Sequence, residues 1–185
     1  MRRIVSILLV LFAFSFTTVS AQLPKAPSWM KGKIVTGGNF GFNIWGDGLY
    51  LSVSPLVGYR LTPALEMGVR FGYDLNYYFG SYYGKYSVHH LSAGAYANYE
   101  VIRGLYLHLE DEQTCRLSFA EGSDSGPRWY NSLFVGAGYR QYVSERAFVY
   151  ISALYNLRWN YSNTGEVDSP YSRPLVLRMG YCIGF

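Results

Sequence analysis

A run of thirteen residues, 65–77, alternates strictly between apolar and polar side chains. Its odd positions carry Leu, Met, Val, Phe or Tyr, and its even positions carry only charged residues, Asn or Gly. A period of two places successive side chains on opposite faces of a β-strand. The run is longer than the roughly 5–6 residues usual in soluble sheets. A tilted strand of about 9–11 residues is enough to span a bilayer.

The same alternation recurs in seven further segments. They lie near residues 33–44, 49–60, 87–99, 105–110, 133–140, 149–157 and 175–185. No segment has convincing helical periodicity. We therefore predict an all-β fold, an antiparallel eight-stranded up-and-down transmembrane β-barrel. An even strand count returns both ends of the barrel to the same side of the membrane.

The connections between these segments alternate between short and long. Residues 61–64, 100–104 and 141–146 are short, whereas residues 76–86, 111–130 and 158–173 are long and polar, and only 46–48 breaks the pattern. Short periplasmic turns and longer extracellular loops are typical of outer-membrane barrels. We expect the long connections to form exposed loops.

The first 21 residues have the organisation of a secretory signal peptide. Arg2 and Arg3 are followed by an apolar core over residues 4–16, and Val19-Ser20-Ala21 is a small-residue cleavage site. The core is shorter than the roughly 20 residues of a spanning helix. We predict a signal peptide over 1–21, a short periplasmic lead over 22–32 and a barrel over 33–185, exported to the bacterial outer membrane.

The polar face of the strands combines glycine with charges of both signs, which suits the interior of a narrow barrel. Buried charges must be paired, and glycine leaves room for long side chains. We predict a lumen charge network of Arg60, Glu66, Arg70, Asp74, Glu110, Arg140 and Arg178. The alternative is a soluble calycin-type barrel, which would bury the apolar face instead.

Aromatic residues recur where strands end. Tyr59, Tyr99 and Tyr139 stand forty residues apart, each closing a strand that returns to the periplasmic side. Such rings form girdles at the membrane–water boundary. We predict an aromatic girdle and C-terminal assembly signal made by Tyr59, Tyr99, Tyr139, Tyr181 and Phe185.

These residues resemble a known group. Residues 54–62 (SPLVGYRLT), 65–73 (LEMGVRFGY) and 181–185 (YCIGF) are similar to motifs of the small OmpA/OmpX-like outer-membrane proteins, in particular the outer membrane protein β-barrel domain. The resemblance covers about residues 33–185. It implies this fold and recognition of the last residues by the barrel-assembly machinery, but no particular activity.

The chemistry-bearing residues offer little beyond this. Only one set of residues has a spacing that hints at catalysis, namely His90, Ser92 and Glu100. The chain resembles the lipid A deacylases here, because those enzymes are eight-stranded barrels with a His, Ser and Glu site. His90 and Ser92 fall on the polar face, away from lipid, so we predict no enzyme, no metal site and no cofactor. The net charge of +4, or +2 without Arg2 and Arg3, is too small to suggest a nucleic-acid partner.

Function is expected in the outer loops. Residues 76–86 (NYYFGSYYGKY) combine Tyr, Ser, Gly and Asn, which suits an adaptable contact surface. The candidate contact residues are Tyr77, Tyr78, Tyr82, Tyr83 and Tyr86. We expect Cys115 to lie in an outer loop, too far from Cys182 for a disulfide.

The expected role is structural or surface interaction, with outer-membrane lipid and lipopolysaccharide, the barrel-assembly machinery and an unidentified extracellular ligand as partners. A narrow channel or, less favoured, a lipid A-modifying enzyme remains the alternative.

Overall fold

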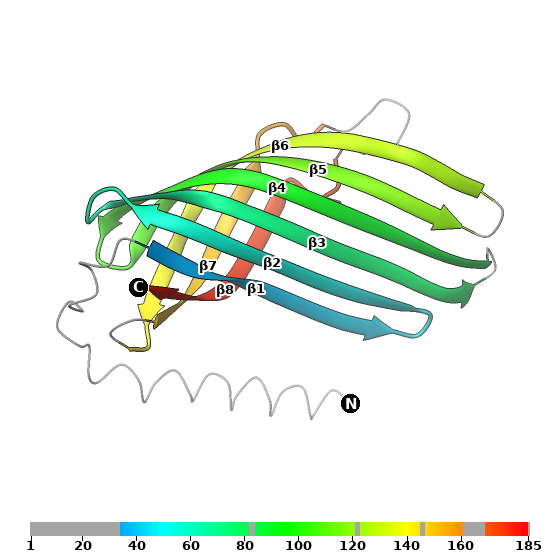
Figure 1. The fold of residues 1–185 in the computed structure, drawn as a ribbon, viewed down its shortest axis with the longest axis horizontal. Coiled ribbons are helices and arrows are strands. Elements are labelled where there is room, and N and C mark those ends of the chain that lie inside the picture. The colour runs from blue at the N-terminus through cyan, green and yellow to red at the C-terminus, as the bar shows by residue number, and fades with distance from the viewer. Residues whose placement is uncertain (1–33, 82–83, 121–122, 145–146, 161–168, 185) are drawn as a thin grey trace.

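The computed structural model describes residues 34–81, 84–120, 123–144, 147–160 and 169–184, which form one closed antiparallel barrel (Figure 1). Each strand pairs with its sequence neighbours, and β1 closes the barrel against β8. The strands are β1 (Ile34–Trp45), β2 (Gly48–Arg60), β3 (Leu65–Ser81), β4 (Gly84–Ile102), β5 (Leu105–Ala120), β6 (Ser123–Tyr142), β7 (Ala147–Asn156) and β8 (Leu175–Gly184). The predicted all-β fold, an antiparallel eight-stranded up-and-down barrel, is confirmed. The proposed signal peptide and periplasmic lead lie outside the described residues.

The strand register fixes how strongly the strands tilt relative to the barrel axis. When the register of the β1–β8 seam is continued two residues past Gly38–Tyr181, the path of paired residues that starts at Leu105 and runs once around the barrel ends at Cys115, ten residues further along the same strand. In an eight-stranded barrel this stagger corresponds to a strand tilt of about 40°. Each residue then gains about 2.5 Å of height along the barrel axis, and each step to the next strand changes the height by about 3 Å.

The alternation seen in the sequence becomes an inverted distribution of side chains. On β3, Met67, Val69 and Phe71 point outward and are exposed, whereas Glu66 and Arg70 point inward and are buried. The outward face carries most of the large apolar side chains, including Leu177 and Met179 at 69% and 71% exposure. A soluble barrel would bury these side chains, so the distribution is that of a barrel with an apolar exterior and a polar interior.

Glycine makes room for aromatic rings inside the barrel. A Cβ atom on Gly138 would collide with the Tyr106 ring, and one on Gly68 would lie 2.8 Å from Tyr96 Cε1. The lumen is therefore filled by tyrosine rings lying over glycine, as well as by the arginines that the sequence predicted.

Short turns join the strands at the end of the barrel where β1 begins and β8 ends. Residues 61–64 form a turn in which Thr62 Oγ1 accepts the Leu65 N–H at 2.9 Å. At the next turn Gly104 adopts a φ of 85°, a left-handed conformation that favours glycine, and its N–H is bound by Glu100 Oε1 at 3.0 Å.

The far end of the barrel differs from the expected pattern of long loops. β3 and β4 extend to Ser81 and Gly84, and β5 and β6 extend to Ala120 and Ser123, so most of 76–86 and 111–130 forms long hairpins. In Figure 1 these four strands project well beyond β7 and β8. Of the three predicted long loops, only the connection between β7 and β8 is a long segment outside the strands. No helix capable of crossing a membrane occurs in the described residues.

Candidate functional site

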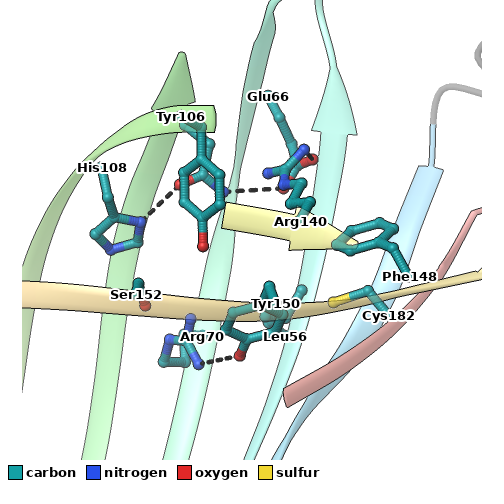
Figure 2. A pocket seen from close by; sticks show the side chains of 11 residues that line it. Leu56, Glu66, Arg70, Tyr106, His108, Arg140, Phe148, Tyr150, Ser152 and Cys182 are labelled. Atoms are coloured by element: carbon teal, nitrogen blue, oxygen red, sulfur yellow. Dashed lines mark hydrogen bonds and ion pairs between the residues drawn. The ribbon is translucent and has the colours of Figure 1, made fainter. Parts of the chain in front are cut away.

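The lumen holds two clusters of charged side chains, the first near the end with the short turns. Glu66 Oε2 lies 3.0 Å from Arg140 Nη1 and 3.7 Å from Arg60 Nε. These three residues come from β3, β6 and β2, and each is at most 6% exposed. One carboxylate therefore ties together strands from both sides of the barrel (Figure 2).

The second cluster lies further along the lumen and centres on Glu110, which is fully buried. Its Oε2 atom is 2.7 Å from Arg178 Nη1 and 3.3 Å from Arg70 Nε. Arg178 also reaches Glu112 Oε2 at 3.1 Å. Two guanidinium groups and two carboxylates thus compensate one another across β3, β5 and β8.

A short polar relay joins the clusters. The Asn98 amide donates to Glu66 Oε1 at 3.2 Å, and its Oδ1 lies 2.6 Å from His108 Nδ1. The other ring nitrogen of His108 is 2.9 Å from Glu110 Oε2. The charges therefore form one continuous network along the lumen.

Tyr171 covers this network at the end with the long hairpins. It lies in the connection between β7 and β8, and its hydroxyl donates to Glu112 Oε1 at 2.6 Å. Burial, reinforced by the neighbouring Glu112 carboxylate, raises the pKa of Tyr171 well above its usual range. The phenol therefore keeps its proton and remains a hydrogen-bond donor.

Aromatic rings pack against the guanidinium groups and leave little free space. Arg140 lies over the rings of Tyr106 and Phe148, at 4.6 and 5.0 Å from their centroids, and Arg178 lies 4.7 Å from that of Phe134. The cavity in Figure 2, lined by Arg140, Tyr106, Phe148 and Cys182 among others, has a volume of only about 20 Å³, which is room for one or two waters. The lumen in this region is a packed polar core.

Six of the seven residues predicted for the lumen network lie in these two clusters. Asp74, the seventh, is half-buried and accepts a hydrogen bond from the Tyr50 hydroxyl at 3.0 Å. Glu112, His108 and Tyr171 belong to the network but were absent from the prediction. The hydrophobic alternation stops at residue 110, so the sequence alone predicts a loop at Glu112.

The spacing that hinted at catalysis does not assemble into a site. His90 and Ser92 lie on the lumen side of β4, and the Glu100 carboxylate binds the Gly104 N–H at the short-turn end. Cys115 lies within β5 and not in a loop, a correction of the sequence-based expectation, while Cys182 lines the lumen cavity. No cluster of metal-ligating side chains occurs among the described residues.

The outer wall carries the predicted aromatic residues. Tyr59, Tyr99, Tyr139 and Tyr181 all point outward, at 43–52% exposure. From the register and tilt, these four side chains fall within about 4 Å of one height, here called the tyrosine level. On β1, β2, β7 and β8 the outward apolar residues end within about 25 Å of this level, and the band up to that height is here called the apolar belt. On the two long hairpins, outward rings such as Phe79 and Phe119 continue beyond it. Phe185 lies outside the described residues.

The predicted contact residues lie beyond the apolar belt, in strands and not in a loop. Tyr77 and Tyr78 belong to β3 and Tyr86 to β4, with the rings of Tyr78 and Tyr86 stacked at 4.1 Å between centroids. Tyr82 and Tyr83 lie outside the described residues. Tyr77, Tyr78 and Tyr86 are therefore held in the paired strands of the β3–β4 hairpin.

Among known proteins, only solved structures are found to be similar to this chain. No family model matches the sequence, and no curated protein does. The fold is similar to the N-terminal β-barrel domain of Pseudomonas aeruginosa OprF, at 16% identity over 83% of this chain and 98% of that chain, with a TM-score of 0.45. It is also similar to Neisserial surface protein A (NspA), at 14% identity over 82% of this chain and 94% of that chain, with a TM-score of 0.46.

Proposed function

We propose that this protein is an integral barrel of a bacterial outer membrane, with a structural or surface-interaction role and no enzymatic activity. The observation that carries the proposal is the inverted distribution of side chains. Phe71, Leu177 and Met179 are 55–71% exposed on the outer wall, whereas Glu110 is fully buried within it. Lipid is the solvent in which exposed apolar side chains around a closed barrel are favourable.

The dimensions of the wall support the same proposal. The apolar belt is about 25 Å tall, the height of the lipid-facing band in outer-membrane barrels. The tyrosine level at its lower edge suits a girdle at the periplasmic interface, where amphipathic rings are enriched. The barrel-assembly machinery is the expected partner during insertion, and outer-membrane lipid and lipopolysaccharide are the expected surroundings.

The surface role rests on the two long hairpins. β3–β4 and β5–β6 continue above the apolar belt, where Phe79, Phe119 and Trp129 are 46–70% exposed. Because strands hold these rings in fixed positions, the hairpins offer a preorganised aromatic surface to an extracellular ligand or to lipopolysaccharide.

A narrow channel is the second candidate, since a small cavity lined by polar side chains exists inside the barrel. The ion pairs around Glu66 and Glu110 cross the lumen, however, and the rings of Tyr106 and Phe148 fill it. We expect no steady conductance in planar bilayers. Reproducible single-channel steps would favour the channel instead.

A lipid-contact measurement tests the main proposal. Single cysteines at Val69 and Phe79, with Cys115 and Cys182 replaced by serine, would carry a fluorophore into vesicles containing a lipid-bound quencher. We expect strong quenching from Val69→Cys, inside the apolar belt, and weak quenching from Phe79→Cys, above it. Water-like emission from Val69→Cys in folded protein would overturn the membrane proposal.

A further inference from the structure

A charged cluster lies on the outward face of the described strands, in the middle of β5 and β6 and just beyond the end of β7. Asp111 Oδ1 accepts a hydrogen bond from the Asn131 amide at 3.0 Å and lies 3.4 Å from Arg158 Nη1. Gln113 is the next outward residue of β5 and is exposed. We call Asp111, Gln113, Asn131 and Arg158 the wall cluster.

The register fixes the height of this cluster in the barrel. Asp111 lies six residues beyond Leu105, which pairs with Tyr139 of the tyrosine level. At about 2.5 Å per residue, Asp111 is about 15 Å above Leu105 and therefore inside the apolar belt. On the outward faces of the described strands, it is the only carboxylate between the two edges of that belt.

Lipid is a poor surrounding for such a group. Acyl chains offer no hydrogen bonds, and charged side chains on the lipid face of a barrel are destabilising near the middle of the bilayer. Arg158 compensates Asp111 in charge, but the two side chains remain 48% and 54% exposed. The pair therefore keeps unused hydrogen-bonding capacity at a height where lipid cannot satisfy it.

From this arrangement we infer that the wall cluster is the contact surface for a second copy of this chain. The inference rests on the proposed membrane location. The cluster carries one negative and one positive group side by side, so it is complementary to itself. A two-fold axis along the membrane normal leaves heights unchanged, and it would bring each Asp111 opposite the Arg158 guanidinium of the other copy.

The surroundings of the cluster suit such a contact. Leu109 and Leu157 flank it on the outward face and are 49% and 55% exposed. An apolar rim around paired charges excludes lipid headgroups and water, which strengthens the electrostatic interaction. In the dimer, ion pairs formed between the two copies would be shielded from water and bordered by apolar side chains.

Charge-reversed variants separate a contact between copies from a pair within one copy. Asp111→Arg makes the cluster wholly positive, and Arg158→Asp makes it wholly negative. Each variant loses the internal ion pair and should not self-associate, whereas a mixture of the two restores attraction between copies. Energy transfer between donor-labelled and acceptor-labelled protein in lipid vesicles measures the association as a function of protein density.

We expect wild-type protein to associate, each variant alone to require at least about tenfold higher density, and the mixture to recover most of the wild-type association. Matched controls are Asp47→Arg, in the turn between β1 and β2, and Lys85→Asp, near the tip of the β3–β4 hairpin, which make the same charge changes away from the cluster and should leave association unchanged. Gel mobility with and without boiling confirms that every variant is folded.

Monomeric wild-type protein that inserts normally would overturn this inference and leave the membrane proposal intact. Failure of folded protein to enter vesicles would overturn both. Association that both variants retain when alone, or that their mixture does not recover, would also overturn the inference, because the wall cluster would then not carry the contact.

Discussion

Glu110 is the residue that joins most of the lumen network. It is fully buried and contacts Arg178, Arg70 and His108. Glu110→Gln keeps the side-chain volume but leaves two buried guanidinium groups with too little negative charge. We expect a loss of about 3–5 kcal/mol in the free energy of unfolding, measured by urea titration in lipid vesicles with gel mobility as the readout. Asp47→Asn, in the exposed turn between β1 and β2, is the control. Equal stability of the two variants would contradict the role given to Glu110.

Replacing Tyr171 should lower the free energy of unfolding by less than replacing Glu110, because Tyr171 makes fewer contacts with the network. Its raised pKa keeps the phenol protonated, and the hydroxyl donates to the Glu112 carboxylate at 2.6 Å. Tyr171→Phe removes this donor while keeping the ring that packs against Phe134. A hydrogen bond to a charged group contributes about 1.5–3 kcal/mol, and the same titration should show a loss in that range. Tyr155→Phe, an outward ring on β7, should change stability little, and an equal loss there would contradict the assignment.

At the scale of the strand, the period-two pattern assigns each side chain to lipid or to lumen. Val69 lies on the outward face of β3 within the apolar belt, and Phe79 lies on the same face above it. Val69→Arg should destabilise the barrel by about 2–4 kcal/mol, whereas Phe79→Arg should cost about 0–1 kcal/mol, because the penalty depends on depth. Unfolding in vesicles measures both. Equal penalties at the two positions would show that the belt does not face lipid.

The strands also show where sequence reasoning succeeds and where it fails. The run over 65–77 is recognisable because one of its faces is apolar throughout. In β5 the outward residues Asp111 and Gln113 are polar, and so are the inward Glu112 and Thr114. With polar residues on both faces the hydrophobic alternation disappears, although the backbone remains extended. The sequence therefore predicts a loop in this region, and for the same reason the predicted lumen network does not include Glu112.

The ion pairs could not be predicted in the same way. Composition indicates which charges must lie in the lumen, because a buried charge requires a partner. Which carboxylate meets which guanidinium depends on strand tilt and on the stagger of ten residues around the barrel. Glu110 and Arg178 are 68 residues apart in the chain and meet only after closure. That stagger emerges from all eight pairings together, so no local pattern in the sequence encodes it.

For the whole molecule, closure depends on the seam between β1 and β8. The register of this seam covers only the four pairs from Val35–Gly184 to Gly38–Tyr181, fewer than at any other junction. The backbones also approach closely here. A Cβ atom on Gly180 would collide with the Gly38 carbonyl oxygen and would lie 2.8 Å from the Tyr150 hydroxyl.

Gly180→Ala should therefore impair closure of the barrel. A collision with backbone cannot be relieved by moving a flexible side chain, so the seam must separate or shift. We expect less than about half of the refolded protein to run as the compact, SDS-resistant species before boiling, since an open edge leaves backbone groups unpaired in lipid. Gly41→Ala is the matched control, because a Cβ there would meet only Ser52 Cβ at 3.3 Å and the Tyr50 ring at 3.5 Å. If the two variants gave the same yield of compact species, the seam would tolerate a side chain at Gly180, and closure would have to depend on the longer junctions around the rest of the barrel.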